Sequence, residues 1–340
     1  MEYAAPFWLP GGHLQTIWPA LFGRYGRRSV KTPAINYQRV RWATPDQDFI
    51  DLDWLHGVPG KPLLVLFHGL EGSSQSHYAL AFAEFAKQHG LSYVVPHFRG
   101  CSGEINLAPR AYHSGDFEEI DWILRRLHQQ HTGEILALGV SLGGNALLRW
   151  GQEMGQTTAR VVAALASVCA PLDLSISGHA MGRGLNRQIY TRMFLASMKP
   201  KAMRKLAQHP GLFSATAMQA ATDLFEFDNI FTAPLHGFKN THDYWLRASA
   251  KPGLAQIRVP TLVVNARNDP FVPAGSLPKS SKVGQSVTLW QPQHGGHVGF
   301  AVARATHAQA LPDTVGHWLL AHAGSDLSRV AGVKAVNHRG

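Results

Sequence analysis

The sequence around Ser141 has the form Gly-x-Ser-x-Gly, with Gly139 and Gly143 two residues away on either side. The apolar run 135–140 predicts a buried strand before this serine, and the apolar positions in 146–150 predict a helix after it. A turn this sharp brings the neighbouring backbone so close that a Cβ at either glycine would clash. Ser141 is therefore expected at an exposed, strained turn, from which its hydroxyl can attack a carbonyl carbon.

Such an attack places negative charge on the carbonyl oxygen, and backbone N–H groups can stabilise that charge. The amide of Leu142 is the first candidate donor, because it begins the predicted helix. The amide of Leu70 is the second, since the turn His68-Gly69-Leu70 follows the continuous apolar run 63–67. An ordinary tight loop remains an alternative for Leu70, because only main-chain atoms are involved.

A serine hydroxyl needs a base within hydrogen-bond reach, and that base needs a carboxylate to orient it. His297 is the predicted base, because it lies in a glycine-rich loop directly after the last predicted strand, 287–290; His294 is its main rival. Asp269 is the predicted carboxylate, because it follows the strand predicted at 259–265. The alternative for Asp269 is a structural turn before Pro270.

Other polar residues are interpreted as structural. Three acidic residues between the predicted strands at 161–168 and 259–265 are assigned no chemistry: Asp223, Asp228 and Asp243. His294 and His297 are better explained as a loop residue and a base than as metal ligands, and no other cluster has convincing ligand spacing. We therefore expect neither a metal nor a cofactor.

Strands and helices alternate along most of the chain. Apolar runs predict strands at 63–67, 91–96, 135–140, 161–168, 259–265 and 287–290, and helical patterns lie between several of them. This alternation predicts a doubly wound, mostly parallel α/β sheet. Two further runs, 38–42 and 49–56, are separated by a Pro-Asp turn and are predicted to be edge strands.

The same patterns divide the chain into four parts. An apolar N-terminal arm, 1–37, is expected to pack on the body, the core comprises 38–170 and 253–323, and 324–340 is a loose tail. Between them, 171–252 lacks strand-like runs and predicts a helical lid insertion. Its amphipathic pattern favours an apolar pocket for short to medium acyl chains, with Met193 and Phe194 as substrate contacts. The alternative is a lid whose apolar face only caps the core, which predicts no dependence of activity on acyl-chain length.

Composition restricts the classes of protein. The chain has 340 residues and is 45% hydrophobic, which permits a large core. Its formal net charge is +10. Because the basic residues are scattered and no nucleic-acid motif surrounds them, we expect no nucleic-acid partner, and weak contact with a membrane surface or anionic lipid is the minor alternative. With no apolar run long enough to span a bilayer and only Cys101 and Cys169, a cytoplasmic protein with reduced thiols is expected.

Several stretches together resemble the α/β-hydrolases, and in particular the bacterial YheT-like esterase family, which is related to animal α/β-hydrolase-domain proteins and to yeast medium-chain ester synthases and esterases. They are GHLQT (12–16), HGLEGS (68–73), HFRGCSG (97–103), YHSG (112–115), GVSLGGN (139–145), NDPF (268–271) and HGGHVGF (294–300). The resemblance implies an α/β-hydrolase fold and a carboxylesterase-type serine hydrolase. It also implies Ser141 as nucleophile, Asp269 as acid, His297 as base and 171–252 as the lid.

Two other functions stay open. The same triad could pass the acyl group to an alcohol in place of water, which would make the chain an acyltransferase. The fold could also serve as a non-catalytic binding module, although a complete triad argues against that. A small-molecule acyl ester is the expected partner in the favoured interpretation.

Overall fold

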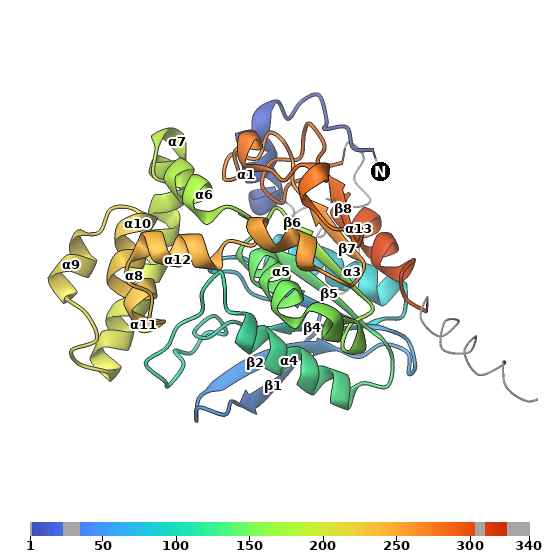
Figure 1. Ribbon diagram of the computed structural model, residues 1–340, viewed down its shortest axis with the longest axis horizontal. Coiled ribbons are helices and arrows are strands. Elements are labelled where there is room, and N and C mark those ends of the chain that lie inside the picture. The colour runs from blue at the N-terminus through green and yellow to red at the C-terminus, as the bar shows by residue number, and fades with distance from the viewer. Residues whose placement is uncertain (1, 23–34, 303–309, 325–340) are drawn as a thin grey trace, which may run out of the picture.

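A mixed sheet of eight strands forms the centre of the computed structural model, which describes residues 2–22, 35–302 and 310–324 (Figure 1). The strands are β1 (Gln38–Ala43), β2 (Phe49–Leu55), β3 (Leu63–Phe67), β4 (Ser92–Pro96), β5 (Ile135–Val140), β6 (Ala164–Val168), β7 (Thr261–Val264) and β8 (Val287–Trp290). Parts of the predicted arm (23–34), of the predicted core (303–309) and nearly all of the predicted tail (325–340) lie outside the described residues.

The strand order is β1-β2-β4-β3-β5-β6-β7-β8. The pairs β1–β2 and β2–β4 are antiparallel, and every other neighbouring pair is parallel. The predicted doubly wound, mostly parallel α/β sheet is therefore confirmed. The prediction that both N-terminal strands are edge strands is wrong for β2, because β2 pairs with β4 as well as with β1. Of these two strands, only β1 lies at an edge of the sheet.

Helices cover both faces of the sheet. Helices α4 (Phe117–Gln130) and α5 (Leu142–Met154) pack on one face, and α3 (His77–Gln88) and α13 (Leu311–Leu320) pack on the other. Strand β3 shows why its sequence is continuously apolar: Leu63, Val65 and Phe67 join the core under α4 and α5, whereas Leu64 and Leu66 join the core under α3 and α13. A strand covered on both faces has no polar side.

Residues 171–252, which we call the helical insertion, contain helices and no strand. The helices are α6 (Leu174–Met181), α7 (Gly184–Asn186), α8 (Arg192–Gln208), α9 (Ala215–Ala220), α10 (Leu224–Phe227), α11 (Ala233–Leu235) and α12 (Thr241–Ala248). A π-helical segment, Arg187–Thr191, joins α7 to α8, so that the chain runs helically through all three. The insertion extends from one side of the sheet, at the left of Figure 1.

Candidate active site

Ser141 occupies the sharp turn between β5 and α5. Its φ is +53°, a value that side-chain-bearing residues rarely adopt. A Cβ built on Gly139 would lie 2.4 Å from the carbonyl oxygen of Gly143, and one built on Gly143 would lie 2.4 Å from that of Phe67. Both glycines are therefore required by close backbone approach, and the turn exposes the serine hydroxyl at the carboxyl edge of the sheet.

The structure brings Ser141, His297 and Asp269 into one hydrogen-bonded chain. The Nε2 atom of His297 lies 3.0 Å from Oγ of Ser141, and its Nδ1 lies 2.8 Å from Oδ2 of Asp269. A carboxylate can only accept, so Nδ1 donates to Asp269 and Nε2 is left to accept from the serine hydroxyl. The three residues follow β5, β7 and β8, whose parallel carboxyl ends meet at this edge.

The rival histidine is not brought to the serine. His294 is exposed, and its Nδ1 lies 3.5 Å from the side-chain amide nitrogen of Asn268. The alternative predicted for Asp269 was a structural turn before Pro270. Asp269 does stabilise such a turn, because its Oδ1 accepts from the amides of Phe271 (2.8 Å) and Val272 (3.3 Å). The two roles are compatible, since one carboxylate oxygen bonds the turn and the other bonds His297.

The N-terminal helix α1 (Gly11–Phe22) holds the His297 loop in place. The hydroxyl of Thr16 accepts from the amide of His297 (2.8 Å) and donates to the carbonyl of Gly12 (2.7 Å). The side-chain oxygen of Gln15 accepts from the amide of Gly295 (2.8 Å). Sequence reasoning missed this function, although both residues lie in the GHLQT stretch that carried the resemblance.

Leu70 and Leu142, whose amides are the predicted oxyanion donors, line the same cavity as Ser141. Among the described residues, neither amide donates to a protein acceptor. Leu142 begins α5, where the first N–H groups of a helix have no partner within the helix. Neither predicted donor is therefore committed to another protein group in the described part of the chain.

Buried side chains shape the loop that carries Leu70. Fully buried His68 accepts from the amide of Phe98 through Nε2 (3.0 Å), and its Nδ1 donates to the carbonyl of Gly69 (2.7 Å). Burial lowers the pKa of His68 to about 3, so the ring stays neutral and keeps this pair of bonds. The hydroxyl of Tyr78 accepts from the amide of Gly69 (2.9 Å).

An apolar cavity opens beside the serine, between the sheet and the helical insertion. Its lining includes Leu174, Met181, Phe194, Met198, Leu224, Trp245 and Phe271. The ring of Phe271 also stacks on His297 with centroids 4.1 Å apart. Of the two predicted substrate contacts, Phe194 lines this cavity, but Met193 does not and is 55% exposed. Successive helical residues point about 100° apart, and in α8 Phe194 faces the cavity while Met193 faces solvent.

Asp228 lines this cavity as well. Its carboxylate accepts from the indole N–H of Trp245 (2.8 Å) and the hydroxyl of Thr232 (2.6 Å). Burial raises the pKa of Asp228 to about 6. A second, more polar cavity adjoins the first across Leu142 and Met198, and the ion pair between Lys201 and Glu71 (2.9 Å) lies in its wall.

One cluster among the described residues has the composition of a metal site: Cys169, Asp269 and His297, whose donor atoms lie within 4.8 Å of one another. Burial raises the pKa of the Cys169 thiol well above its usual value, so the thiolate that a metal requires is disfavoured. The thiol instead accepts a bond from the amide of Val298 (3.3 Å). Because Asp269 and His297 are bonded to each other, the donor set fits proton transfer better than metal binding.

Comparison with known proteins places this geometry in a family. The model of the alpha/beta hydrolase fold matches residues 62–303. The Escherichia coli protein YheT, which is named as a candidate esterase, is 40% identical over 90% of this chain and 89% of its own length. Human phospholipase ABHD3 is 27% identical over 84% of this chain and 74% of its own length. The esterase Pf2001 of Pyrococcus furiosus shares the fold with a TM-score of 0.54, at 17% identity over 85% of this chain and 94% of that one. The chain therefore belongs to the α/β-hydrolase family of esterases and lipases, in which YheT is one of its relatives.

Proposed function

We propose that this protein hydrolyses carboxylic esters with short to medium acyl chains through an acyl-enzyme on Ser141. The observation that carries the proposal is the hydrogen-bonded chain from Ser141 through His297 to Asp269, which ends at an apolar cavity. The proposal agrees with the name of the relative YheT, which is called a candidate esterase.

In the first half of the proposed reaction, Oγ of Ser141 attacks the ester carbonyl carbon and its proton passes to Nε2 of His297. The negative charge that forms on the carbonyl oxygen is stabilised by the amides of Leu70 and Leu142. When the tetrahedral intermediate collapses, the bond to the alcohol oxygen breaks and His297 returns the proton to the departing alcohol. Asp269 stabilises the imidazolium ion during both steps.

In the second half, a water molecule takes the place of the alcohol. His297 accepts a proton from this water, and the resulting hydroxide attacks the acyl carbon. Collapse of the second intermediate breaks the bond to Oγ, His297 returns the proton to Oγ, and the carboxylic acid is released with the hydroxyl of Ser141 restored. The same two amides stabilise the oxyanion again.

The acyl chain is assigned to the apolar cavity because its lining is flexible and apolar. Met181, Phe194 and Met198 contribute side chains from α6 and α8, and methionines adapt to varied apolar shapes. Each methylene that leaves water contributes up to about 0.8 kcal/mol until the cavity is full. Activity should therefore rise over the first few carbons of the acyl chain and then fall once the chain fills the cavity, whose lining also includes Asp228 and Trp245.

Alanine variants of the serine and the two histidines test the proposal. Ser141→Ala and His297→Ala should each lower kcat for p-nitrophenyl butyrate by several orders of magnitude, whereas His294→Ala, the matched control, should stay near wild type. A fluorophosphonate probe should label wild type and fail to label Ser141→Ala. Turnover or labelling that survives loss of Ser141 would refute the assignment.

A further inference from the structure

An exposed apolar stripe runs along the helical segment that begins at α7. Leu185, Ile189 and Met193 are spaced four residues apart and are 58%, 41% and 55% exposed. Residues four apart lie on one side of a helix, so the three side chains form one ridge. The opposite side of this segment is buried, with Tyr190 and Thr191 facing the protein.

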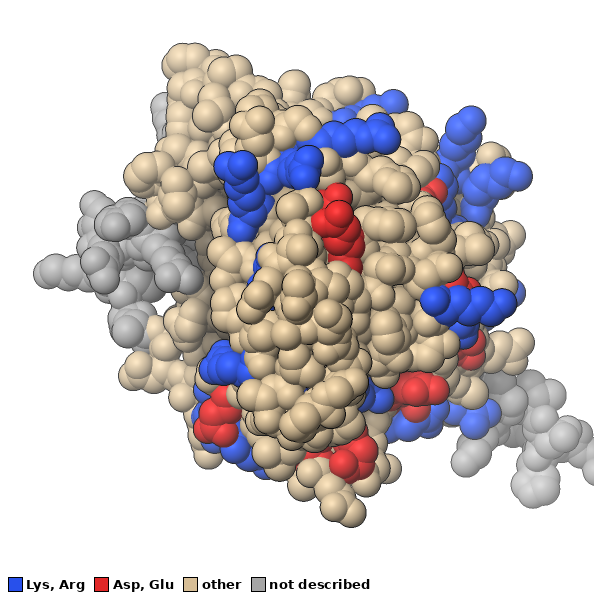
Figure 2. Space-filling model, turned by 90° about the vertical axis from the view of Figure 1, so that its left-hand side faces the viewer, with Lys and Arg blue, Asp and Glu red and all other residues tan. Residues whose placement is uncertain are grey.

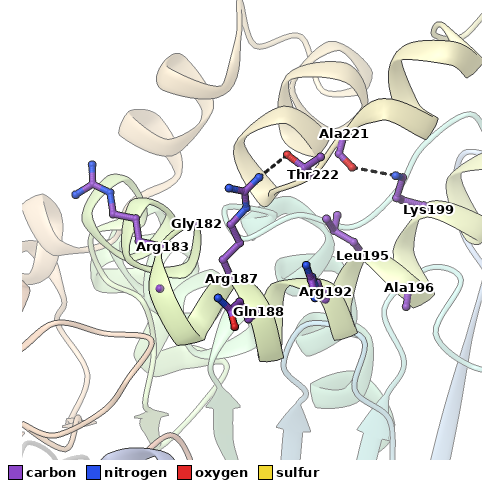
Figure 3. Close-up of a pocket in the computed structure, with 11 residues that line it drawn as sticks. Gly182, Arg183, Arg187, Gln188, Arg192, Leu195, Ala196, Lys199, Ala221 and Thr222 are labelled. Carbon is purple, nitrogen blue, oxygen red and sulfur yellow. Dashed lines mark hydrogen bonds between the residues drawn. The ribbon is translucent and has the colours of Figure 1, made fainter.

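A cationic groove lies beside this ridge on the same segment (Figure 3). Arg183, Arg187, Arg192 and Lys199 contribute its charges. Among the described residues, none of the four lies within salt-bridge distance of a carboxylate, although most other arginines of the sheet body are paired. The groove therefore presents four positive charges that no acidic side chain neutralises by direct contact.

The polar contacts of the groove residues do not neutralise the positive charges of Arg187 and Lys199. Arg187 donates to the hydroxyl of Thr222 (2.9 Å), and Nζ of Lys199 donates to the carbonyls of Gln219 (2.6 Å) and Ala221 (2.9 Å). These acceptors are neutral. The carboxylate of Glu226 accepts from the hydroxyl of Thr222 (3.0 Å), and hydrogen bonds from Thr222 together with the charge of Arg187 lower the pKa of Glu226, but no ion pair joins the side chains of Glu226 and Arg187. In Figure 3 the side chains of Arg183 and Arg187 extend away from the backbone that carries them.

The groove and the ester cavity lie on either side of α8. Phe194 and Met198 line the cavity at Ser141, whereas the intervening Leu195 and the following Lys199 line the groove. Likewise, Met181 at the end of α6 lines the cavity and the next residue, Gly182, lines the groove. A partner on the outer side of α8 would therefore sit next to the walls of the proposed acyl pocket.

We propose that the ridge and the groove together, which we call the docking face, bind the surface of an anionic lipid bilayer. Lipid phosphates would occupy the groove, and Leu185, Ile189 and Met193 would enter the interface between headgroups and acyl chains. Apolar side chains next to arginines on one helical surface are typical of segments that lie in such an interface. Charge complementarity supports this occupant, because blue Lys and Arg side chains outnumber red Asp and Glu side chains in the upper half of Figure 2, which views the molecule from the side of the helical insertion.

The proposed mode is binding at the surface. None of the helices in the described part of the chain has both the length and the apolar character needed to span a bilayer. Docking through α7 and α8 would place the ester cavity close to lipid, while the sheet body stays in water. Binding is measured without turnover, so it is tested independently of the esterase proposal.

Sedimentation with lipid vesicles tests the docking face. We expect the full chain to sediment with vesicles of equal parts phosphatidylcholine and phosphatidylglycerol, and not with vesicles of phosphatidylcholine alone. Each arginine near an anionic surface contributes a factor of about five in partitioning, the equivalent of about 1 kcal/mol. The triple variant Arg183→Gln/Arg187→Gln/Arg192→Gln should thus bind about a hundredfold more weakly. The double variant Leu185→Ser/Ile189→Ser should weaken binding by roughly tenfold, because it transfers less apolar surface from water into the bilayer interface.

A charge-matched variant on the sheet body is the control. Lys87→Gln/Arg160→Gln/Lys282→Gln removes the same charge from exposed positions outside the helical insertion and should keep most of the binding. All three variants should hydrolyse p-nitrophenyl acetate at the wild-type rate, which shows that they fold. Equal losses in the control and groove variants would refute the docking face. Binding to phosphatidylcholine alone, or displacement from vesicles by inorganic phosphate at constant ionic strength, would also refute it.

Discussion

Substitution of Thr16 by valine tests whether the N-terminal helix positions the base. Thr16 is buried, and its hydroxyl is the acceptor for the amide of His297. Valine has nearly the same shape but no oxygen, so Thr16→Val leaves that amide buried without a partner. The bond to Gly12 is lost as well, which loosens the turn of α1 that faces the His297 loop.

The expected magnitude follows from the unsatisfied amide. A buried donor without an acceptor costs about 1–3 kcal/mol. If the His297 loop moves to relieve that cost, Nε2 leaves its 3.0 Å contact with Ser141, and kcat should fall by roughly 5- to 150-fold, the equivalent of the same energy range. KM should change little, because Thr16 does not line the ester cavity.

Steady-state kinetics on p-nitrophenyl butyrate, together with thermal unfolding, separate positioning from a general loss of stability. Thr16→Ser keeps the hydroxyl and should restore kcat to within a few-fold of wild type. A merely structural contribution would lower Tm and the amount of active enzyme without changing kcat per active site, as titrated with a fluorophosphonate. If Thr16→Val has a wild-type kcat per titrated site, or if Thr16→Ser is equally impaired, the positioning argument fails.

Three further predictions test the carboxylate, the cavity and a buried histidine. Asp269→Asn should keep the fold but lower kcat on the order of ten-thousandfold, as in the serine-protease template, because His297 loses its tautomer control; a loss below about tenfold would mean that another carboxylate serves. Met198→Trp should shift the kcat/KM optimum on p-nitrophenyl esters to shorter acyl chains, whereas Met193→Trp, at an exposed position, should not; equal profiles for both would remove the cavity from acyl binding. Burial lowers the pKa of His236 to about 3, so the neutral ring stabilises the fold above about pH 6.5 and this contribution is lost as the pH falls towards 3. His236→Phe should therefore abolish up to about 2 kcal/mol of the decrease in unfolding free energy that wild type shows at about pH 5. The measurement is Tm against pH, which should be flatter for the variant, and an unchanged slope would contradict the prediction.

Much of the fold could be predicted from the chain because its signals are local. The continuous apolar runs of β3 and β5 mark strands that are covered on both faces, and the alternation with helices implies parallel pairing. Strand order is a different matter. The place of β4 between β2 and β3 is a matter of pairing between whole strands, which the residue pattern within one strand does not specify, so the assignment of β2 to an edge was wrong.

The candidate site divides in the same way. The spacing of Gly139, Ser141 and Gly143 specifies the turn, because the clashes that require glycine involve backbone only a few residues away or on the adjacent strand β3. The choice between His294 and His297 needed the folded loop, since both lie in the same glycine-rich stretch and only one ring points to the serine.

The sequence by itself determined the serine turn, the class of sheet and the order Ser, Asp, His along the chain, because each of these depends on residue type and short-range spacing. Only the tertiary structure decided that Thr16 bonds the amide of His297, a contact across 281 positions of the chain. It also decided that Phe194 faces the cavity while Met193 faces out. Contacts of this kind depend on where distant segments pack, and no local pattern of residues encodes that placement.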